Sequence, residues 1–457
     1  MKELVFEKKG NDPLYVQLYY YFRKLIECGQ LENNSKMMSI RRCCEEFGLS
    51  KTTVENAYLQ LAAEGYIISK PQSGYYVCQL NFTEKSTDKE YSFSEVKNEK
   101  IKTEYDFTSS SVDSESFDFS LWQRYIKSAL RQSERLISYG DVQGEPDLRN
   151  AVSAYISKNR SVVCSSEQIV IGAGTQILLS ILCSLIPEKC SIAFIGSSFE
   201  RGEAVFEDYG HECFRFRSFP ESLDELSEKN IKLIYISPSH FTEEGDILPI
   251  NQRIDLLNYA KKNDCLIIED DYDSEFRYYS KPIPSLQGIA GGNEVIYIST
   301  FSKLLIPSIR ISFMVLPFSL LSKYKEKGRL YNQTASKLEQ IALCQFIRDG
   351  HLNVQIRKQR KLFSQKSKAL CDEIKKVFGD SAKAKILPAG YLVKLTFLNG
   401  ALCKDLSFLA GKKGILMPPI KSEKEYSIIL SCTSVPIKKY FSALSEIKSI
   451  INEKSSE

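Results

Sequence analysis

Lys303 is the residue whose position could support unusual chemistry in this chain of 457 residues. It follows a hydrophobic run, residues 295–298, that predicts a buried strand, and it lies in a hydroxyl-rich turn between apolar flanks. Burial lowers the pKa of an amine, so a lysine here could form a Schiff base with an aldehyde. Arg310 could bind a phosphate with two bonds, aided by the hydroxyls of Thr300 and Ser302. Taken alone, the stretch is explained more simply as a strand that ends in a solvated basic turn.

A second stretch, roughly thirty residues upstream, changes that balance. Cys265–Ile268 predicts another buried strand, and it leads into an acidic run that contains Asp270 and Tyr272. Pyridoxal phosphate needs a carboxylate against its ring nitrogen, so that the protonated ring can accept electrons, and commonly a tyrosine near its ring oxygen. The carboxyl ends of neighbouring parallel strands meet at one rim of a sheet, where open α/β sheets bind ligands. We therefore expect Asp270 and Lys303 to converge on this cofactor, with Tyr272 beside the ring oxygen.

The two stretches read EDDYDSEFRY (residues 269–278) and STFSKLLIPSIR (residues 299–310). They resemble the MocR/GabR-type regulators, a branch of the GntR superfamily. Those proteins join a winged helix-turn-helix to a fold-type I, pyridoxal-phosphate-binding aminotransferase-like domain. The acidic string is typical of that group, whereas the lysine and arginine are shared with fold-type I aminotransferases more widely. The resemblance extends from about Asp12 to about residue 440.

The resemblance implies a multidomain protein. Its N-terminal part is expected to be an α+β winged helix-turn-helix, followed by an α/β aminotransferase-like domain with a mostly parallel sheet and a small C-terminal α/β domain. The recurring strand–loop–helix pattern from residue 168 to residue 316 also predicts that sheet. The expected boundaries are 12–79 for the winged helix, 80–105 for a polar linker and 106–457 for the second domain, divided into a large part (about 106–318) and a small part (about 330–457).

The N-terminal residues independently predict a DNA-binding arrangement. Apolar spacing predicts a helix at 40–47, which Gly48 is suited to end, and Ser50 is suited to cap the next helix, 51–64. Two short alternating runs after it, as far as Val77, predict the strands of a wing. The helix pair alone could be an interaction module without DNA, but the wing favours binding to double-stranded DNA.

Residues 37–66, MMSIRRCCEEFGLSKTTVENAYLQLAAEGY, resemble the corresponding run of the GntR-type winged helix. The resemblance implies that the ends of the helices and the tip of the wing contact a double-stranded DNA operator. Arginine and lysine suit phosphates or guanine edges, and hydroxyls and amides at helix N-termini suit phosphate oxygens. The implied DNA-binding residues are Ser39, Arg41, Ser50, Lys51, Thr52, Thr53, Ser73 and Gly74.

A glycine turn adds a candidate phosphate site. The strand expected at 168–171 and the helix expected at 177–186 flank Gly174, Thr175 and Gln176. Backbone N–H groups and the helix dipole converge at such a turn and favour an anion. By itself the pattern is weak, because glycine turns often only connect a strand to a helix.

Further residues come from the resemblance alone. Tyr139 begins a Y-x-x-x-x-G-x-x-x-L-R run, whose tyrosine in fold-type I enzymes reaches across the dimer to the other subunit's cofactor phosphate. Phe199 takes the place of a ring that stacks on the pyridine, and Arg201 lies near the expected effector pocket. His240 could form a hydrogen bond near the cofactor, or it could be a loop histidine satisfied by backbone. The family's PSHQxPTG segment reads Phe-Thr-Glu-Glu between His240 and Gly245 in this chain.

One departure from the family concerns the effector. Ligand-binding members usually place an arginine in the last strand to hold the ligand's carboxylate, but residues 428–432 read IILSC. Losing such a contact would cost several kcal/mol. Either the effector lacks that carboxylate, another residue supplies the charge, or the cofactor itself is the signal.

The composition excludes several other classes. Thirteen cysteines are scattered without a CxxC pair, and with three histidines they offer no spacing suited to zinc, so no metal is expected. No signal peptide and no apolar run long enough to span a membrane is recognised, so we expect a cytoplasmic protein with reduced thiols. A net charge of +4 neither requires nor excludes nucleic acid.

We therefore interpret the chain as a transcriptional regulator that senses pyridoxal 5′-phosphate, an amine or an amino acid through a Schiff base at Lys303, without transaminase turnover. A homodimer is expected by analogy. An active aminotransferase with an attached DNA-binding domain is the alternative, and the missing arginine argues against it. A third hypothesis makes the large domain only a dimerisation scaffold.

Overall fold

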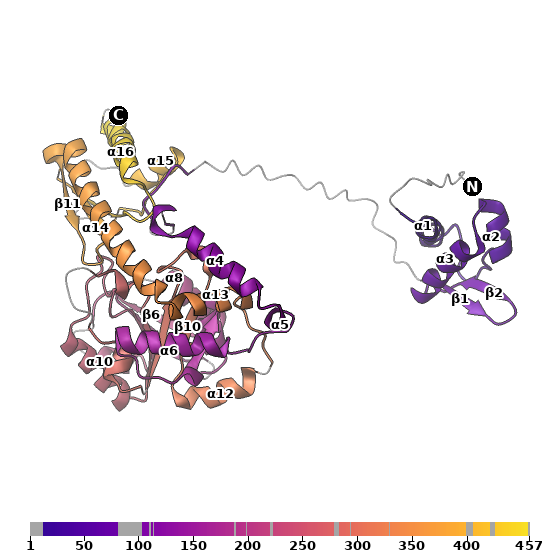
Figure 1. Ribbon diagram of the computed structural model, residues 1–457, viewed down its shortest axis with the longest axis horizontal. Coiled ribbons are helices and arrows are strands. Elements are labelled where there is room, and N and C mark those ends of the chain that lie inside the picture. Colours follow the sequence, from indigo (N-terminus) through magenta and orange to yellow (C-terminus); the bar gives the residue numbers. More distant parts are fainter. Residues whose placement is uncertain are drawn as a thin grey trace. The chain divides into compact units, whose positions relative to one another are not determined.

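The computed structural model divides the chain into two units, Met1–Asn98 and Glu99–Glu457 (Figure 1). Most of the linker expected at 80–105 lies outside the residues that the structure describes. Within those residues, no helix is both long and apolar enough to cross a membrane. The described residues are 12–80, 103–108, 111–112, 114–186, 189–197, 199–219, 223–277, 283–292, 294–328, 330–398, 405–420 and 426–455.

The first unit has the predicted helix-turn-helix and wing. Gly48 ends the second helix in the left-handed conformation, at φ 63°, and the Ser50 hydroxyl caps the third by accepting from the Thr53 N–H. Phe22 and Tyr58 meet edge to face, with ring centroids 5.5 Å apart, in the core of the unit. The elements are α1 (Leu14–Glu27), α2 (Ile40–Phe47), α3 (Lys51–Ala63) and the antiparallel strands β1 (Ile67–Lys70) and β2 (Gly74–Val77).

A seven-stranded sheet is the centre of the large domain, in the order β4-β10-β9-β8-β7-β5-β6. β10 runs antiparallel to both of its neighbours, β4 and β9, and the other neighbouring pairs are parallel, so the predicted mostly parallel sheet is confirmed. The strands are β4 (Ile169–Gly172), β5 (Ser191–Ile195), β6 (Glu212–Phe216), β7 (Ile231–Ile236), β8 (Leu266–Asp270), β9 (Val295–Thr300) and β10 (Ser312–Val315).

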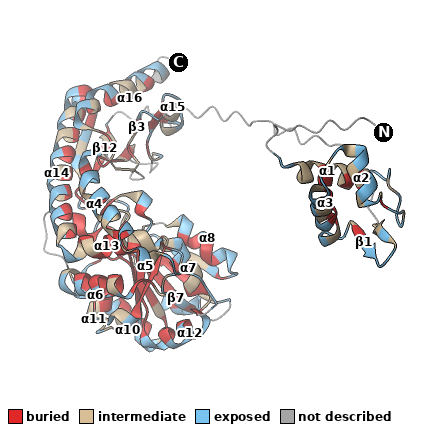
Figure 2. Ribbon diagram, turned by 45° about the vertical axis from the view of Figure 1, so that its right-hand side comes forward, coloured by how far each residue is buried: buried red, intermediate tan, exposed pale blue. Residues whose placement is uncertain are grey.

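Residues of β9 alternate between the two faces of this sheet, as a strand buried on both sides requires. Ile296 and Ile298 pack with apolar residues of α7, α8 and α12, whereas Val295 and Tyr297 pack on the opposite face. Buried residues accordingly concentrate on the sheet, with exposed residues on the outer sides of the helices (Figure 2). The helices of the large domain are α4 (Phe119–Leu130), α5 (Ser133–Leu136), α6 (Pro146–Arg160), α7 (Thr175–Cys183), α8 (Glu200–Asp208), α9 (Asp224–Glu228), α10 (Ile250–Lys262), α11 (Leu286–Ile289), α12 (Phe318–Gly328) and α13 (Lys337–Arg348).

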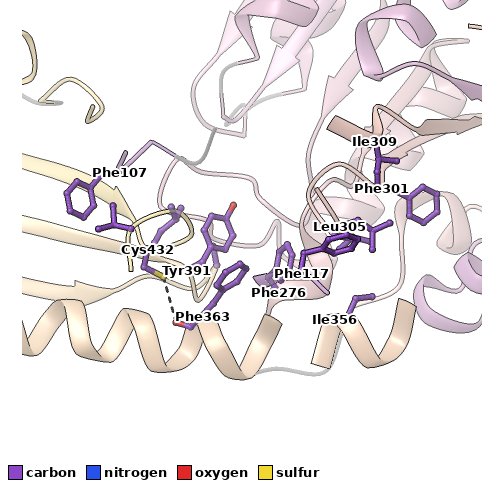
Figure 3. Packing of buried hydrophobic residues seen from close by; sticks show 14 of the residues in the cluster. Phe107, Phe117, Phe276, Phe301, Leu305, Ile309, Ile356, Phe363, Tyr391 and Cys432 are labelled. Atoms are coloured by element: carbon purple, nitrogen blue, oxygen red, sulfur yellow. Dashed lines mark hydrogen bonds between the residues drawn. The ribbon is translucent and has the colours of Figure 1, made fainter. Parts of the chain in front are cut away.

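The small domain is an antiparallel sheet in the order β11-β12-β14, packed against α14. Phe363 of α14 lies near Tyr391 and Phe276, so apolar packing continues from the small domain toward the Phe301–Ile309 segment (Figure 3). The elements are α14 (His351–Phe378), β11 (Ala382–Ile386), β12 (Leu392–Phe397), α15 (Leu406–Lys412), β13 (Ile415–Leu416), β14 (Ser427–Ser431) and α16 (Tyr440–Ser455).

Tyr105, the last residue of the expected linker, belongs to this fold. It forms β3 (Tyr105–Asp106), which pairs in parallel with β13, and its side chain is buried. An isolated aromatic residue in a polar run carried no periodic signal, so the sequence did not show where it packs.

A buried ion pair ties α6 to the end of β8. Arg160 and Asp271 lie 2.6 Å apart, with side chains 3% and 1% exposed. The hydroxyl of Tyr297 also donates to Asp271, at 2.6 Å. This pair fixes the backbone that follows β8, where the acidic run begins.

Replacing Asp271 by alanine should therefore destabilise the protein strongly. The change leaves the Arg160 guanidinium buried without its carboxylate, and the free energy of unfolding should fall by roughly 3–5 kcal/mol. Urea unfolding measures this loss. Glu167→Ala is the control, because its pair with Lys325 is mostly exposed and should change stability by less than about 1 kcal/mol. Equal effects of the two changes would contradict the expectation.

Candidate functional site

Asp270 and Lys303 converge, as the sequence predicts. β8 ends at Asp270, and the neighbouring parallel strand β9 ends at Thr300, three residues before Lys303. Asp270, Tyr272 and Lys303 all line one cavity of about 750 Å³, which we call the Asp270 cavity.

Most of the residues expected to bind the cofactor line this cavity. Tyr139 does not, and neither does His240, which is expected to contact the effector. Residues that the sequence did not single out include several hydroxyls and a proline pair from the small domain. The expected residues in the cavity are Gly174, Thr175, Gln176, Phe199, Arg201, Asp270, Tyr272, Thr300, Ser302, Lys303 and Arg310. The additional ones are Thr108, Ser197, Glu200, Ser237, Ser312, Pro418 and Pro419.

The Asp270 carboxyl is buried beneath the cavity and accepts a hydrogen bond from the hydroxyl of Tyr235. Burial raises the pKa of Asp270 to about 7, and the Tyr235 hydrogen bond opposes the rise only in part. A cation placed against this carboxyl would restore its charged form, which is what a protonated pyridine nitrogen requires. The sequence did not single out Tyr235, because a tyrosine within the apolar run of β7 is expected to be a residue of the hydrophobic core.

The other acidic residues of the run have structural partners. Glu269 accepts from the first N–H groups of α11, at 2.9 Å each. Asp271 pairs with Arg160, and Glu275 accepts from the hydroxyl of Tyr155 at 3.1 Å. Asp273 accepts from the hydroxyl of Tyr391 at 2.8 Å and lies 2.6 Å from the His240 imidazole. Asp270 alone among these acidic residues lines the cavity.

Lys303 lies between the sheet and the small domain. Burial lowers the pKa of its amine, and the charge of Asp273 opposes this only in part. Its Nζ is 5.6 Å from the centre of the Tyr391 ring. A lysine in this environment has the lowered pKa that Schiff-base chemistry needs.

The part of the Asp270 cavity that Gly174, Ser302 and Arg310 line suits a phosphate. Gly174, at φ 104°, precedes α7; this backbone conformation favours glycine, and a Cβ there would lie 2.4 Å from Arg310 Nη2. Arg310 has the left-handed backbone conformation, φ 53°, which is uncommon outside glycine and often found at functional sites. The Ser302 hydroxyl is buried with no hydrogen-bond partner among the described residues. Guanidinium, helix N-terminus and an unsatisfied hydroxyl together fit a phosphate group.

Phe199 and Arg201 lie at the N-terminal end of α8. The Phe199 ring stacks on Tyr235, with centroids 5.6 Å apart and planes at 26°. Arg201 is exposed, and its carbonyl accepts from the Gln176 amide at 3.1 Å. Stacking of Phe199 on the cofactor and contact of Arg201 with an effector stay predictions.

His240 is buried, and among the described residues its imidazole is bonded to the Asp273 carboxylate. Its ring lies 5.3 Å from that of Tyr272, which lines the Asp270 cavity. Tyr139 is 95% exposed and lies outside that cavity. Its expected role toward a partner subunit stays a prediction.

A second cavity, of about 490 Å³, adjoins Lys303 and Tyr272. We call it the Lys394 cavity. Residues of both the large and the small domain line it: Phe107, His240, Glu243, Glu244, Tyr272, Lys303, Tyr391, Leu392, Lys394, Pro418, Pro419, Ser427, Ile429 and Ser431. Two cavities that share Lys303 suit a cofactor and a second small molecule that approaches it.

The expected DNA-binding residues lie on the surface of the first unit. Arg41, Lys51 and Thr52 are exposed, and the two cations form surface ion pairs with Glu45 and Glu55. The hydroxyls of Ser39 and Ser50 cap helices, Thr53 bonds to Ser50, and Ser73 bonds to Tyr76 at the wing. Gly74 begins β2 at φ 101°. Lys36 and Lys70, which the sequence reasoning missed, lie over the Tyr76 ring at 5.9 and 4.4 Å.

These two units define a class of protein: a winged helix-turn-helix joined to an aminotransferase fold. Family models agree, since class I and II aminotransferases match residues 108–427 and the gntR family of bacterial regulatory proteins matches residues 14–77. The chain belongs to the family of transcriptional regulators that combine these two domains, the MocR type. This family and fold imply pyridoxal 5′-phosphate as the cofactor, and the residues of the Asp270 cavity fit it.

Individual relatives are similar over most of the chain. The HTH-type transcriptional regulator YdeL of Bacillus subtilis (strain 168) is 37% identical over 418 residues, 89% of each chain. The probable rhizopine catabolism regulatory protein MocR of Rhizobium meliloti is 30% identical over 389 residues, 80% of this chain and 79% of that protein. The pyridoxine biosynthesis regulator PdxR of Corynebacterium glutamicum is 24% identical, over 81% of this chain and 80% of that protein.

Solved aminotransferases share the fold of the second unit. An archaeal alanine:glyoxylate aminotransferase superposes with a TM-score of 0.67 at 20% identity, covering 79% of this chain and 93% of that one. The kynurenine aminotransferase of Pyrococcus horikoshii gives 0.65 at 20% identity, covering 76% and 91%. Identity this low shows the fold alone.

Asp270→Asn should stabilise the cofactor-free protein at high pH. The folded state raises the Asp270 pKa from 3.8 to about 7. The carboxyl is neutral in both states below about pH 4; between about pH 4 and pH 7 it ionises in the unfolded state only, so stability falls across that range and levels off above it. Asparagine never ionises but still accepts from Tyr235. The variant should gain up to about 4 kcal/mol over the natural chain by pH 8, and little of this below pH 4.

Thermal unfolding of the two proteins across pH 4–8, after removal of the cofactor, measures this difference. Glu269 and Glu275, whose pKa values burial also raises to about 7, are present in both and cancel. A difference independent of pH would contradict the buried-carboxyl interpretation.

Proposed function

We propose that this chain is a DNA-binding transcriptional regulator that binds pyridoxal phosphate covalently at Lys303 and responds to the cofactor or to an amine that approaches it. The observation that carries the proposal is the convergence of Asp270 and Lys303 on one cavity, with a second cavity that the same lysine also lines. The first cavity suits the cofactor, and the second gives an effector access to the bond between lysine and cofactor.

Each group has a distinct role in this proposal. Bound pyridoxal phosphate supplies an aldehyde that binds amines. Lys303 would hold that aldehyde, and the Asp270 carboxylate would keep a proton on the ring nitrogen. Tyr272 would bond to the ring oxygen and Phe199 would lie against the ring. Phosphate binding falls to the residues at the far end of the cavity: Gly174, Thr175, Gln176, Thr300, Ser302 and Arg310.

A response to an effector requires two states with different affinities. The Lys394 cavity is built from both the large and the small domain, so a ligand in it can favour one arrangement of the two. His240 and Arg201 are the candidate effector contacts from the large domain. We further infer a homodimer, in which the exposed Tyr139 reaches the cofactor phosphate of the other subunit.

Regulation is favoured over transamination by the strand β14. Its residues at the Lys394 cavity are Ser427, Ile429 and Ser431, none of which can clamp a substrate carboxylate as arginine does. An aminotransferase remains the second candidate, because the fold is that of the family. Repeated turnover on any pair of amino acid and keto acid would favour it.

Lys303→Ala should abolish covalent retention of the cofactor. After incubation with pyridoxal phosphate and reduction with borohydride, the natural chain should gain the mass of one reduced pyridoxyl phosphate group on the peptide that contains residue 303. The alanine variant should gain none there. Lys325→Ala, at an exposed lysine of α12, is the matched control and should retain the label. Labelling of the Lys303→Ala variant at the same stoichiometry would contradict the assignment.

Arg41→Ala and Lys51→Ala should weaken DNA binding. Each removes one exposed cation from the end of a helix in the first unit. If the side chain contacts a phosphate, the slope of log affinity against log salt should fall by about 1. Gel shifts on DNA upstream of its own gene, repeated at several salt concentrations, measure this slope. The same gel shifts with and without pyridoxal phosphate measure the response to the cofactor.

Lys229→Ala, far along the sequence in the large domain, is the control and should leave the shift unchanged. A footprint that is the same with and without cofactor would favour the scaffold hypothesis instead.

A further inference from the structure

The loop that follows β7 places a histidine at the Lys394 cavity. His240 is 6% exposed, and it lines this cavity together with Lys303. Its backbone N–H donates to the Ser237 carbonyl at 3.0 Å, and its carbonyl accepts from the Ser197 hydroxyl at 2.9 Å. The backbone that carries the imidazole is therefore held on both sides of the ring.

One nitrogen of this imidazole is bonded to a buried carboxylate. The Nδ1 of His240 lies 2.6 Å from Asp273 Oδ2, which also accepts from the Tyr391 hydroxyl at 2.8 Å. Burial would raise the pKa of Asp273, but the charges and hydrogen bonds around this carboxyl hold its pKa below the usual value. The carboxyl is therefore ionised near neutral pH. Because an ionised carboxylate only accepts hydrogen bonds, the His240 Nδ1 has to carry a proton.

The other nitrogen of the ring is left for a ligand. When the proton is on Nδ1, the Nε2 of a neutral imidazole has a lone pair that can accept another. No residue that the structure describes forms a hydrogen bond with the His240 Nε2. The side chain lines the cavity through which a second molecule would approach Lys303. An imidazole oriented by a carboxylate on one nitrogen, with its other nitrogen left for the reactant, is the arrangement of a general base.

Three other groups that line the cavity are less suited to accept a proton. Burial raises the pKa of Tyr272 and of Tyr391 well above the usual value of a phenol, so both keep their protons near neutral pH. Glu244 already binds Lys394, at 2.7 Å. Histidine is also the side chain that most often serves as a general base. The imidazole is therefore the stronger candidate.

We propose that His240 is a catalytic base for the exchange of amines at Lys303, and that Asp273 is its positioning residue. The proposal rests on the proposed function, because the exchange takes place at the cofactor bound to that lysine. An amine arrives as an ammonium ion, which has no lone pair with which to attack a carbon.

The proton transfers balance over the whole exchange. His240 Nε2 takes one proton from the ammonium group of the ligand. The ligand nitrogen then bonds to the aldehyde carbon of the cofactor, while the bond from that carbon to Lys303 Nζ breaks. The released lysine takes the proton from His240, so the imidazole returns to its first state.

Two amines distinguish this role from a structural one. Propylamine is an ammonium ion at neutral pH and needs a base, whereas the nitrogen of hydroxylamine is unprotonated there and needs none. In the full-length, cofactor-loaded protein, stopped-flow absorbance gives the exchange rate and the half-saturating concentration for each amine. His240→Asn keeps an N–H donor for Asp273 but has no basic nitrogen, so exchange with propylamine should slow by about 100-fold or more. The rate with hydroxylamine and the half-saturating concentration of propylamine should stay close to those of the natural chain.

Chemical rescue gives a second test. His240→Ala removes the ring from the wall of a cavity of about 490 Å³. Free imidazole added to this variant should restore part of the rate with propylamine, in proportion to its concentration. His351→Asn is the matched control, because His351 packs against Tyr125 and Phe346 and is not among the residues that line the Lys394 cavity. It should change neither rate.

The position of the proton can be measured without the cofactor. The chain has only three histidines, which makes their ring nitrogens accessible to NMR after ¹⁵N labelling. In the cofactor-free protein at neutral pH, His240 should carry its proton on Nδ1 and leave Nε2 unprotonated. Asp273→Asn should lose this preference, since the amide no longer requires a donor on Nδ1.

Equal slowing of the two amines by His240→Asn would overturn the role of His240 as a base. Unchanged rates in that variant, a failure of imidazole to rescue His240→Ala, or a His240 proton on Nε2 would do the same. If neither amine changes the absorbance of the natural chain, the proposed function itself is wrong. Melting temperatures of the ligand-free variants close to that of the natural chain verify that they fold.

Discussion

Burial of carboxylates at the end of β8 is the constraint on which the site depends. Five acidic residues occupy seven positions here, Glu269, Asp270, Asp271, Asp273 and Glu275, and all five are buried. A buried charge is costly unless it is paired or hydrogen-bonded. Helix N–H groups, an arginine, an imidazole and tyrosine hydroxyls bind four of them, although one oxygen of Asp271 has no hydrogen-bond partner among the described residues. Asp270 accepts from the Tyr235 hydroxyl and is the one of the five that lines the Asp270 cavity, so it is the one that a cation bound there can contact.

The same constraint joins the two domains beside Lys303. Burial alone would raise the pKa of Asp273, but the imidazole of His240 and the hydroxyl of Tyr391 hold it below its usual value. His240 comes from the large domain and Tyr391 from the small domain, so the hydrogen bonds to the Asp273 carboxylate join the two domains. Its charge also favours the protonated amine of Lys303. The acidic run therefore contributes to the domain contact and offsets part of the effect of burial on the pKa of Lys303.

Local chemistry was readable from the sequence. Gly48 and Ser50 act on their own helix ends, so residue type and spacing predicted them correctly. Asp270 and Lys303 were predicted together because adjacent parallel strands end at one rim. Contacts between residues that are far apart in the sequence could not be predicted, because they depend on which strands become neighbours and in which register they pair. Tyr235 beneath Asp270 and the small-domain strand β11, which no helix or turn signal marked, are of this second kind.

The pairing of Lys394 with Ile429 belongs to that second kind too, and it changes the meaning of the missing arginine. Sequence alone shows a lost charge; register shows a charge moved to the adjacent strand and matched by Glu244. Lys394 of the small domain and Glu244 of the large domain thus join the two domains through an ion pair within the chain. A ligand shifts an equilibrium only through unequal affinity for its two states. On the proposed function, that inequality has to come from groups other than this ion pair, and Lys303, which lines both cavities, is the candidate.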